Sequence, residues 1–121
     1  ERLRAREWQL WGAGQLSTGI YRTRALKLGF FTFPEQVAEA NLNAATGALK
    51  ELNGLLEDRD WLVGRGATIA DLDIYGIVAY APQAQIDLAA YPHVRRWMGR
   101  VEALSGFKNV DNALPKESKA A

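Results

Sequence analysis

The sequence predicts an all-α domain. Apolar residues recur at steps of three and four along four stretches, and no stretch alternates apolar and polar residues with a period of two. Steps of three and four place apolar side chains on one side of a helix, whereas a half-buried strand requires alternation. Because 48% of the 121 residues are hydrophobic, the chain can bury one core without cross-links. We therefore expect a single bundle of about five helices.

Residues 1 to about 24 predict a long amphipathic helix, which would span about 36 Å at 1.5 Å per residue. Gly12, Gly14 and Gly19 interrupt it, and each weakens a helix by up to about 1 kcal/mol relative to alanine. We expect either a bend or a close contact that needs a bare backbone at these positions.

The next stretch, residues 25–33, carries three phenylalanines around a glycine and is interpreted as a connector with an apolar side. Pro34 favours the first turn of a new helix. The spacing after it is the strongest periodic signal in the chain and predicts a core helix that ends near Glu57. Its expected buried stripe comprises Val37, Ala38, Leu42, Ala45, Leu49, Leu52, Leu55 and Leu56.

A capping box predicts the start of the third helix. In Thr68-Ile69-Ala70-Asp71, the Thr68 hydroxyl can accept from the Asp71 amide while the Asp71 carboxylate accepts from the Thr68 amide. The following residues are apolar on most sides, which predicts a central, enclosed helix ended by Pro82. Gly76 in its middle is expected to permit close packing of a neighbour.

The last predicted helix opens at Pro92 and ends near Gly106. Beyond Val110 the chain has little to bury, so residues 111–121 are expected to form a loosely ordered tail. The buried stripe of the last helix is expected to comprise Val94, Trp97, Met98, Val101 and Leu104.

Composition excludes several classes of function. The net charge of +1 is too small for a strong attraction to nucleic acid or anionic lipid. The basic residues at either end of the first helix are therefore interpreted as a solvated face or as subunit contacts. The absence of cysteine excludes disulfides and thiolate chemistry and favours a reducing compartment. No apolar run approaches the roughly 20 residues that cross a bilayer. We expect a soluble, cytoplasmic protein without nucleic-acid or membrane partners.

Four motifs carry a resemblance to a known family. They are Trp61-Leu62-Val63-Gly64, Ala67-Thr68-Ile69-Ala70-Asp71-Leu72, Tyr91-Pro92-His93-Val94-Arg95-Arg96-Trp97 and Val101-Glu102-Ala103-Leu104-Ser105-Gly106-Phe107. In order and spacing they resemble the C-terminal helical domain of bacterial glutathione transferases. The resemblance covers about residues 1–110, with specific motifs only between 61 and 107.

The resemblance implies a division of labour with a second domain. In that family, an N-terminal thioredoxin-like domain binds glutathione and supplies the group that activates its thiol, and these 121 residues do not contain it. The chain also begins without a methionine and without a helix cap, so we expect it to be a piece of a longer protein. The helical domain would contribute one wall of the electrophile pocket, drawn chiefly from its first helix, and part of a homodimer interface.

By position in the family's first helix, Trp11, Ser17 and Tyr21 are the predicted substrate-binding residues. They offer apolar surface to a hydrophobic electrophile and hydroxyls to orient it. The polar and aromatic residues of this helix point in too many directions for one core-facing stripe, so some of them should face outward. The alternative is that Trp8 and Trp11 both belong to the core.

No residue is predicted to be catalytic or to bind a metal. A reciprocal cap already explains Asp71. His93, the only histidine, follows Pro92 with no acidic or nucleophilic neighbour and is expected to face solvent. One histidine and no cysteine exclude the usual zinc sets.

Two functions remain open at this point. The resemblance implies a parent protein that conjugates glutathione, as co-substrate, to small hydrophobic electrophiles; this domain alone would be inactive and would hold no cofactor. The alternative is a non-catalytic assembly module, since related helical domains serve in translation factors and aminoacyl-tRNA synthetase complexes, and a fold does not settle a function.

Overall fold

A computed structural model describes residues 2–107; residue 1 and residues 108–121, which include the predicted tail, lie outside the described part. Between residues 2 and 107 there are five α-helices and no strand, so the predicted all-α class and helix number are confirmed. The elements are α1 (Arg2–Trp11), a π-helical turn η1 (Gly12–Leu16), α2 (Ser17–Lys27), α3 (Glu35–Leu55), α4 (Ile69–Val78), the 3-10 turns η2 (Ala81–Ala84) and η3 (Leu88–Ala90), and α5 (Pro92–Glu102).

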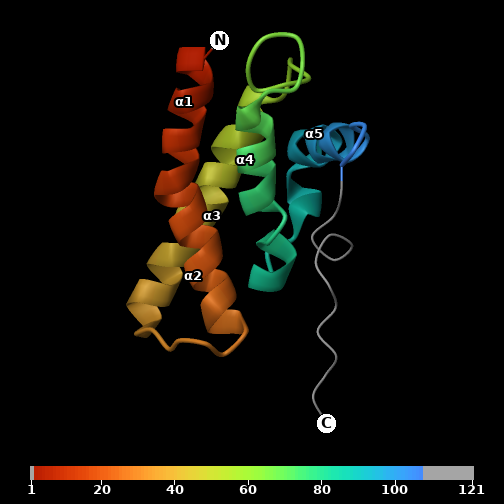
Figure 1. The fold of residues 1–121 in the computed structure, drawn as a ribbon. Coiled ribbons are helices and arrows are strands. Elements are labelled where there is room, and N and C mark those ends of the chain that lie inside the picture. The colour runs from red at the N-terminus through yellow and green to blue at the C-terminus, as the bar shows by residue number, and fades with distance from the viewer. Residues whose placement is uncertain (1, 108–121) are drawn as a thin grey trace.

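The first predicted helix is bent rather than straight. α1, η1 and α2 follow one another as one long helical segment, drawn in red to orange in Figure 1. At Gly14 the backbone leaves the helical region, with φ −85° and ψ −120°, and the segment kinks there. The predicted bend is confirmed. It falls at a glycine because a residue without a side chain adopts non-helical backbone angles at the lowest cost.

Two other glycines of this segment let helices approach closely. A Cβ at Gly19 would lie 2.8 Å from the Cα of Ala45 on α3, and a Cβ at Gly12 would collide with the side chain of Ile74 on α4. The expected close contact is therefore present twice. Gly76 differs: a Cβ there would meet nothing within 4 Å, so the prediction that it permits close packing is wrong.

The core lies between α2, α3, α4 and α5. α2 packs against α3, while α4 contacts α1, α2 and α5, which confirms its central position (Figure 1). The largest fully buried apolar side chains are Trp97, Leu16, Ile20, Leu49, Leu52, Leu56, Ile74, Val63, Val78, Val94 and Val101.

The predicted buried stripe of α3 is only partly correct. Leu49 and Leu52 are fully buried, but Val37, Leu42 and Leu55 are 40%, 39% and 37% exposed. The neighbouring helices cover only part of this wide apolar face, so its margins stay in contact with solvent. Periodicity alone cannot tell which part of such a face a neighbour will cover.

The start of α4 has the predicted capping box, and its carboxylate does more than cap. The Thr68 hydroxyl accepts from the Ala70 amide at 3.2 Å, and Asp71 Oδ2 accepts from the Thr68 amide at 2.9 Å. Asp71 is fully buried, and its Oδ1 also accepts from the Leu62 amide at 3.0 Å and from Trp97 Nε1 at 2.8 Å. One carboxylate thus joins the loop before α4, the α4 terminus and α5.

A side chain from another helix caps α5. Pro92 opens this helix as predicted, and no side chain of its own N-cap residue forms a cap. Instead Asn53 on α3 accepts through Oδ1 from the amides of His93 and Val94, at 2.9 and 3.2 Å. These bonds satisfy two of the backbone amides that a helix start leaves without an internal partner, and Pro92 itself has no N–H to satisfy. Residues 40 positions apart in sequence therefore fix how α5 meets α3.

Candidate functional site

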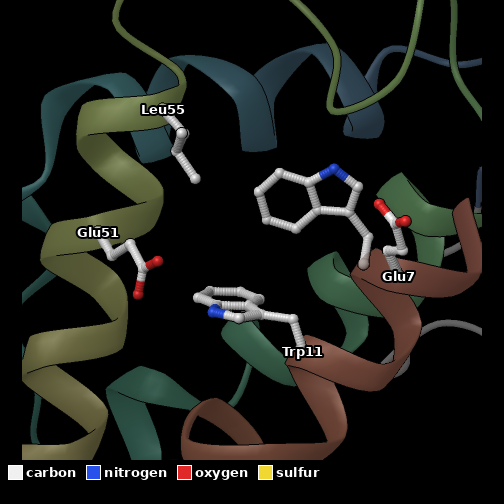
Figure 2. A pocket seen from close by; sticks show the side chains of 5 residues that line it. Glu7, Trp11, Glu51 and Leu55 are labelled. Atoms are coloured by element: carbon white, nitrogen blue, oxygen red, sulfur yellow. The ribbon is translucent and has the colours of Figure 1, made fainter. Parts of the chain in front are cut away.

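The first candidate site is a hollow between α1 and α3. It has a volume of about 260 Å³ and is lined by Glu7, Trp8, Trp11, Glu51 and Leu55. Figure 2 shows Trp11 extending from α1, and Glu51 and Leu55 from α3, toward the space between the two helices. The rings of Trp8 and Trp11 meet edge to face, with centroids 5.3 Å apart and planes at 81°. This geometry is a favoured one for aromatic pairs and holds both indoles in place.

Two carboxylates border the indole pair. Glu7 and Glu51 are exposed, and the ion pairs among residues 2–107, Arg59–Asp58 and Arg100–Asp60, involve neither of them. The hollow is therefore acidic and aromatic, and its negative charge has no basic partner in the described part of the chain.

The second candidate site surrounds Tyr21. Its ring lies edge to face with that of Tyr80, with centroids 5.8 Å apart, and the Arg24 guanidinium lies 4.8 Å from the centroid of Tyr80. Partial burial raises the pKa of the Tyr21 hydroxyl, Tyr80 raises that pKa further, and Arg24 opposes the shift. The hydroxyl is therefore protonated at neutral pH and can donate a hydrogen bond. A hollow of about 500 Å³ here is lined by Tyr21, Arg22, Ala25, Phe31 and Phe33.

The three predicted substrate-binding residues do not share one hollow. Trp11 lines the hollow toward α3, and Tyr21 lines the hollow beside the connector. Ser17 is half-buried, and its hydroxyl donates to the carbonyl of Ala13 at 3.1 Å within the same helical segment. The role of all three in substrate binding stays a prediction.

The sequence did not decide whether Trp8 and Trp11 belong to the core or face outward. In the structure each indole does both. Both indoles are half-buried and pack against the core, yet both line the hollow. Sequence reasoning missed Glu7 and Glu51. The spacing of Glu7 and Trp11, and of Glu51 and Leu55, puts each pair on one helix face, but only the packing of α1 against α3 brings the faces together.

An apolar surface spans α1 and α4 on another side of the molecule. Leu3 is 77% exposed, and Ile69 and Leu72 at the start of α4 are 53% and 47% exposed. A shallow hollow of about 410 Å³ lies there, lined by Arg2, Leu3, Ala5, Arg6, Gln9 and Ile69. Such large apolar side chains in contact with solvent across two neighbouring helices are typical of a surface that another protein unit covers.

No metal site is formed by the described residues. Within residues 2–107, no three His, Cys, Asp or Glu side chains lie together so that they could hold a metal ion. Over the same residues, no helix combines the length and apolar character needed to span a membrane. His93, predicted to face solvent, is half-buried at the start of α5.

The fold defines a helical domain built around a capped central helix. Residues 12–105 match the family described as glutathione S-transferase, C-terminal domain, and the chain belongs to this family. A glutathione S-transferase structure from Xanthobacter autotrophicus has a TM-score of 0.82 and 32% identity, with 88% of this chain and 53% of that chain covered.

Two kinds of relatives share part of the sequence. Glutathione S-transferase D7 of Drosophila melanogaster is 35% identical over 66 residues, 54% of this chain and 28% of that protein. A protein described as probable glutamate–tRNA ligase, cytoplasmic, from Dictyostelium discoideum is 33% identical over 79 residues, 60% of this chain and 10% of that protein. The chain thus matches only a part of each relative's length.

Proposed function

We propose that this domain is the electrophile-binding and dimerisation half of a glutathione transferase that conjugates glutathione to small hydrophobic electrophiles. A thioredoxin-like domain outside this chain would bind glutathione as co-substrate and activate its thiol. This domain would supply selectivity for the electrophile, and the active protein would be a cytoplasmic homodimer.

The exposed apolar surface on α1 and α4 is the observation that carries this proposal. Leu3, Ile69 and Leu72 would cost free energy in solvent but would be stabilising beneath a second domain. The likeness to a longer transferase structure supports the same assignment, since this chain covers only 53% of that one.

Trp11, Ser17 and Tyr21 are proposed to form the electrophile wall. Trp11 presents a half-buried indole, and Tyr21 a protonated hydroxyl whose pKa is raised by partial burial. An apolar surface with a few hydrogen-bonding groups is the usual composition of small-molecule sites. Because the two residues line different hollows, the wall would be completed by the thioredoxin-like domain.

The test compares two proteins with 1-chloro-2,4-dinitrobenzene as electrophile. We expect no conjugation above the uncatalysed rate for the 121-residue chain and measurable turnover for the longer protein with its thioredoxin-like domain. In the longer protein, Trp11→Ala should raise the KM for the electrophile about threefold to tenfold while the KM for glutathione is unchanged. Turnover by the chain alone, or equal changes in both KM values, would overturn the proposal.

The second candidate is a non-catalytic assembly module, favoured by the 33% identity to the Dictyostelium tRNA ligase. In this case the surface on α1 and α4 would bind another protein of a complex. The longer protein would then lack conjugation activity, and Leu3→Ser would release a co-purifying partner. A thioredoxin-like domain that binds glutathione would contradict this candidate.

A further inference from the structure

The hollow between α1 and α3 combines two features that attract positive charge. Its walls include the two indole rings of Trp8 and Trp11, and its borders include the carboxylates of Glu7 and Glu51. Aromatic faces attract cations through their quadrupole, and tryptophan does so most strongly. Glutamates that line the same space add a direct Coulomb attraction.

The chain's own basic side chains leave both features available. Among residues 2–107, the cation–π contact is that of Arg24 with Tyr80, at the other hollow. The ion pairs of the same residues involve neither Glu7 nor Glu51, as described above. A cation from outside would therefore not have to displace one that belongs to the described residues.

The size of the hollow limits the occupant. A volume of about 260 Å³ lies just below the usual range for ligand pockets, about 300–1,000 Å³, so it suits a small head group. Leu55 contributes an aliphatic wall, which favours a cation with an alkyl surface over a strongly hydrated metal ion.

We propose that the hollow lined by Trp8, Trp11, Glu7 and Glu51 binds a small organic cation of the quaternary ammonium or guanidinium class. This site goes beyond the proposed transferase function, because it requires neither glutathione nor an electrophile. The cationic group could belong to a free small molecule or to an arginine side chain of another protein, and both present the same chemistry to the hollow.

The experiment follows the indole N–H resonances of the chain by NMR, with matched cationic and neutral probes. Choline is compared with its neutral isostere 3,3-dimethylbutan-1-ol, and N-acetylarginine amide with N-acetylcitrulline amide. We expect at least one cation to shift the resonances of Trp8 and Trp11, and its neutral isostere to leave them unchanged. The resonance of Trp97, whose Nε1 donates to the buried Asp71, should not move. A choline response indicates a free ligand, and a response to the arginine probe alone indicates a protein side chain.

Two variants test the carboxylates. Glu51→Gln and Glu7→Gln should each weaken cation binding about twofold to fivefold, the usual range for an exposed ion pair. Glu39→Gln, an exposed position three turns away on α3, is the matched control and should leave the affinity unchanged. Both glutamates are exposed, so their replacement should not unfold the chain.

Equal shifts from cations and neutral isosteres would overturn the proposal, as would an affinity that Glu51→Gln and Glu7→Gln leave unchanged. Trp11 is not used as a variant here, because it also belongs to the proposed electrophile wall. If the transferase proposal fails, cation binding to this hollow is unaffected. If cation binding fails, the transferase proposal is unaffected.

Discussion

The first helical segment and the segment around α4 and α5 differ in the environment of their side chains. The second buries and fully hydrogen-bonds a carboxylate, whereas the first leaves large apolar side chains exposed. Asp71 is fully buried and accepts four hydrogen bonds, from Leu62, Thr68 and Trp97. On α1, Leu3 and Leu10 are 77% and 75% exposed. The Thr68–Asp71 motif therefore serves folding, whereas α1 contributes both to the hollow that it shares with α3 and to the apolar surface that it shares with α4.

Removal of the buried carboxylate should have the largest effect on the stability of the chain. Asp71→Ala leaves the Leu62 amide and the Trp97 indole N–H buried without acceptors, so the free energy of unfolding should fall by about 3–5 kcal/mol. Denaturant unfolding measures this loss of free energy. Asp73→Ala, at an exposed position of the same helix, removes only an exposed hydrogen bond from Gln9 on α1 and should lower the free energy of unfolding by about 1 kcal/mol or less. Equal losses in the two variants would refute the role of Asp71 in joining the segments.

Gly19→Ala should rank second, because it brings a methyl group against the α3 backbone at Ala45. Overpacking of this kind costs about 1–3 kcal/mol. Gly76→Ala is the control, since its methyl group meets nothing within 4 Å and should be neutral or stabilising by up to about 1 kcal/mol. Thermal unfolding of both variants distinguishes the close contact from helix propensity. Similar melting temperatures for the two would show that α2 and α3 tolerate a wider separation.

Thr68→Ala should cost about 1 kcal/mol, the usual loss for a helix cap, without changing any ligand binding. The hydroxyl accepts from the Ala70 amide at 3.2 Å, and alanine leaves that amide unpaired. Thr68→Ser keeps the hydroxyl and should retain most of the stability. Unfolding curves of wild type and both variants test this, and an unchanged curve for Thr68→Ala would count against the capping role.

Leu3→Ser should have the smallest effect on the chain itself, within about 0.5 kcal/mol, since the side chain is 77% exposed. In the longer protein the same change should lower the melting temperature, because the leucine would there be covered by the second domain. The measurement compares the change in melting temperature caused by Leu3→Ser in the isolated chain with that in the longer protein. A large loss in the isolated chain would mean that Leu3 already packs within this domain.

Local rules predicted the helices and their starts because these depend on residues a few positions apart. Pro34 and Pro92 precede or open α3 and α5, and Thr68 caps α4, as predicted. The bend in the first helix was predicted from its glycines, although the π-helical turn was not. The predictions that the whole apolar stripe of α3 is buried and that Gly76 permits close packing were wrong. Both features depend on neighbouring helices, which a helical pattern does not identify.

The sequence by itself determined the helical class, the capped start of α4 and the family, because periodicity and caps act within one or two turns. Only the tertiary structure decided that Asp71 accepts from Trp97, 26 residues away, and that Asn53 caps a helix 40 residues further on. It also decided that Glu51 borders the indole of Trp11. These contacts arise where helix faces meet, and the packing of the whole core fixes that meeting.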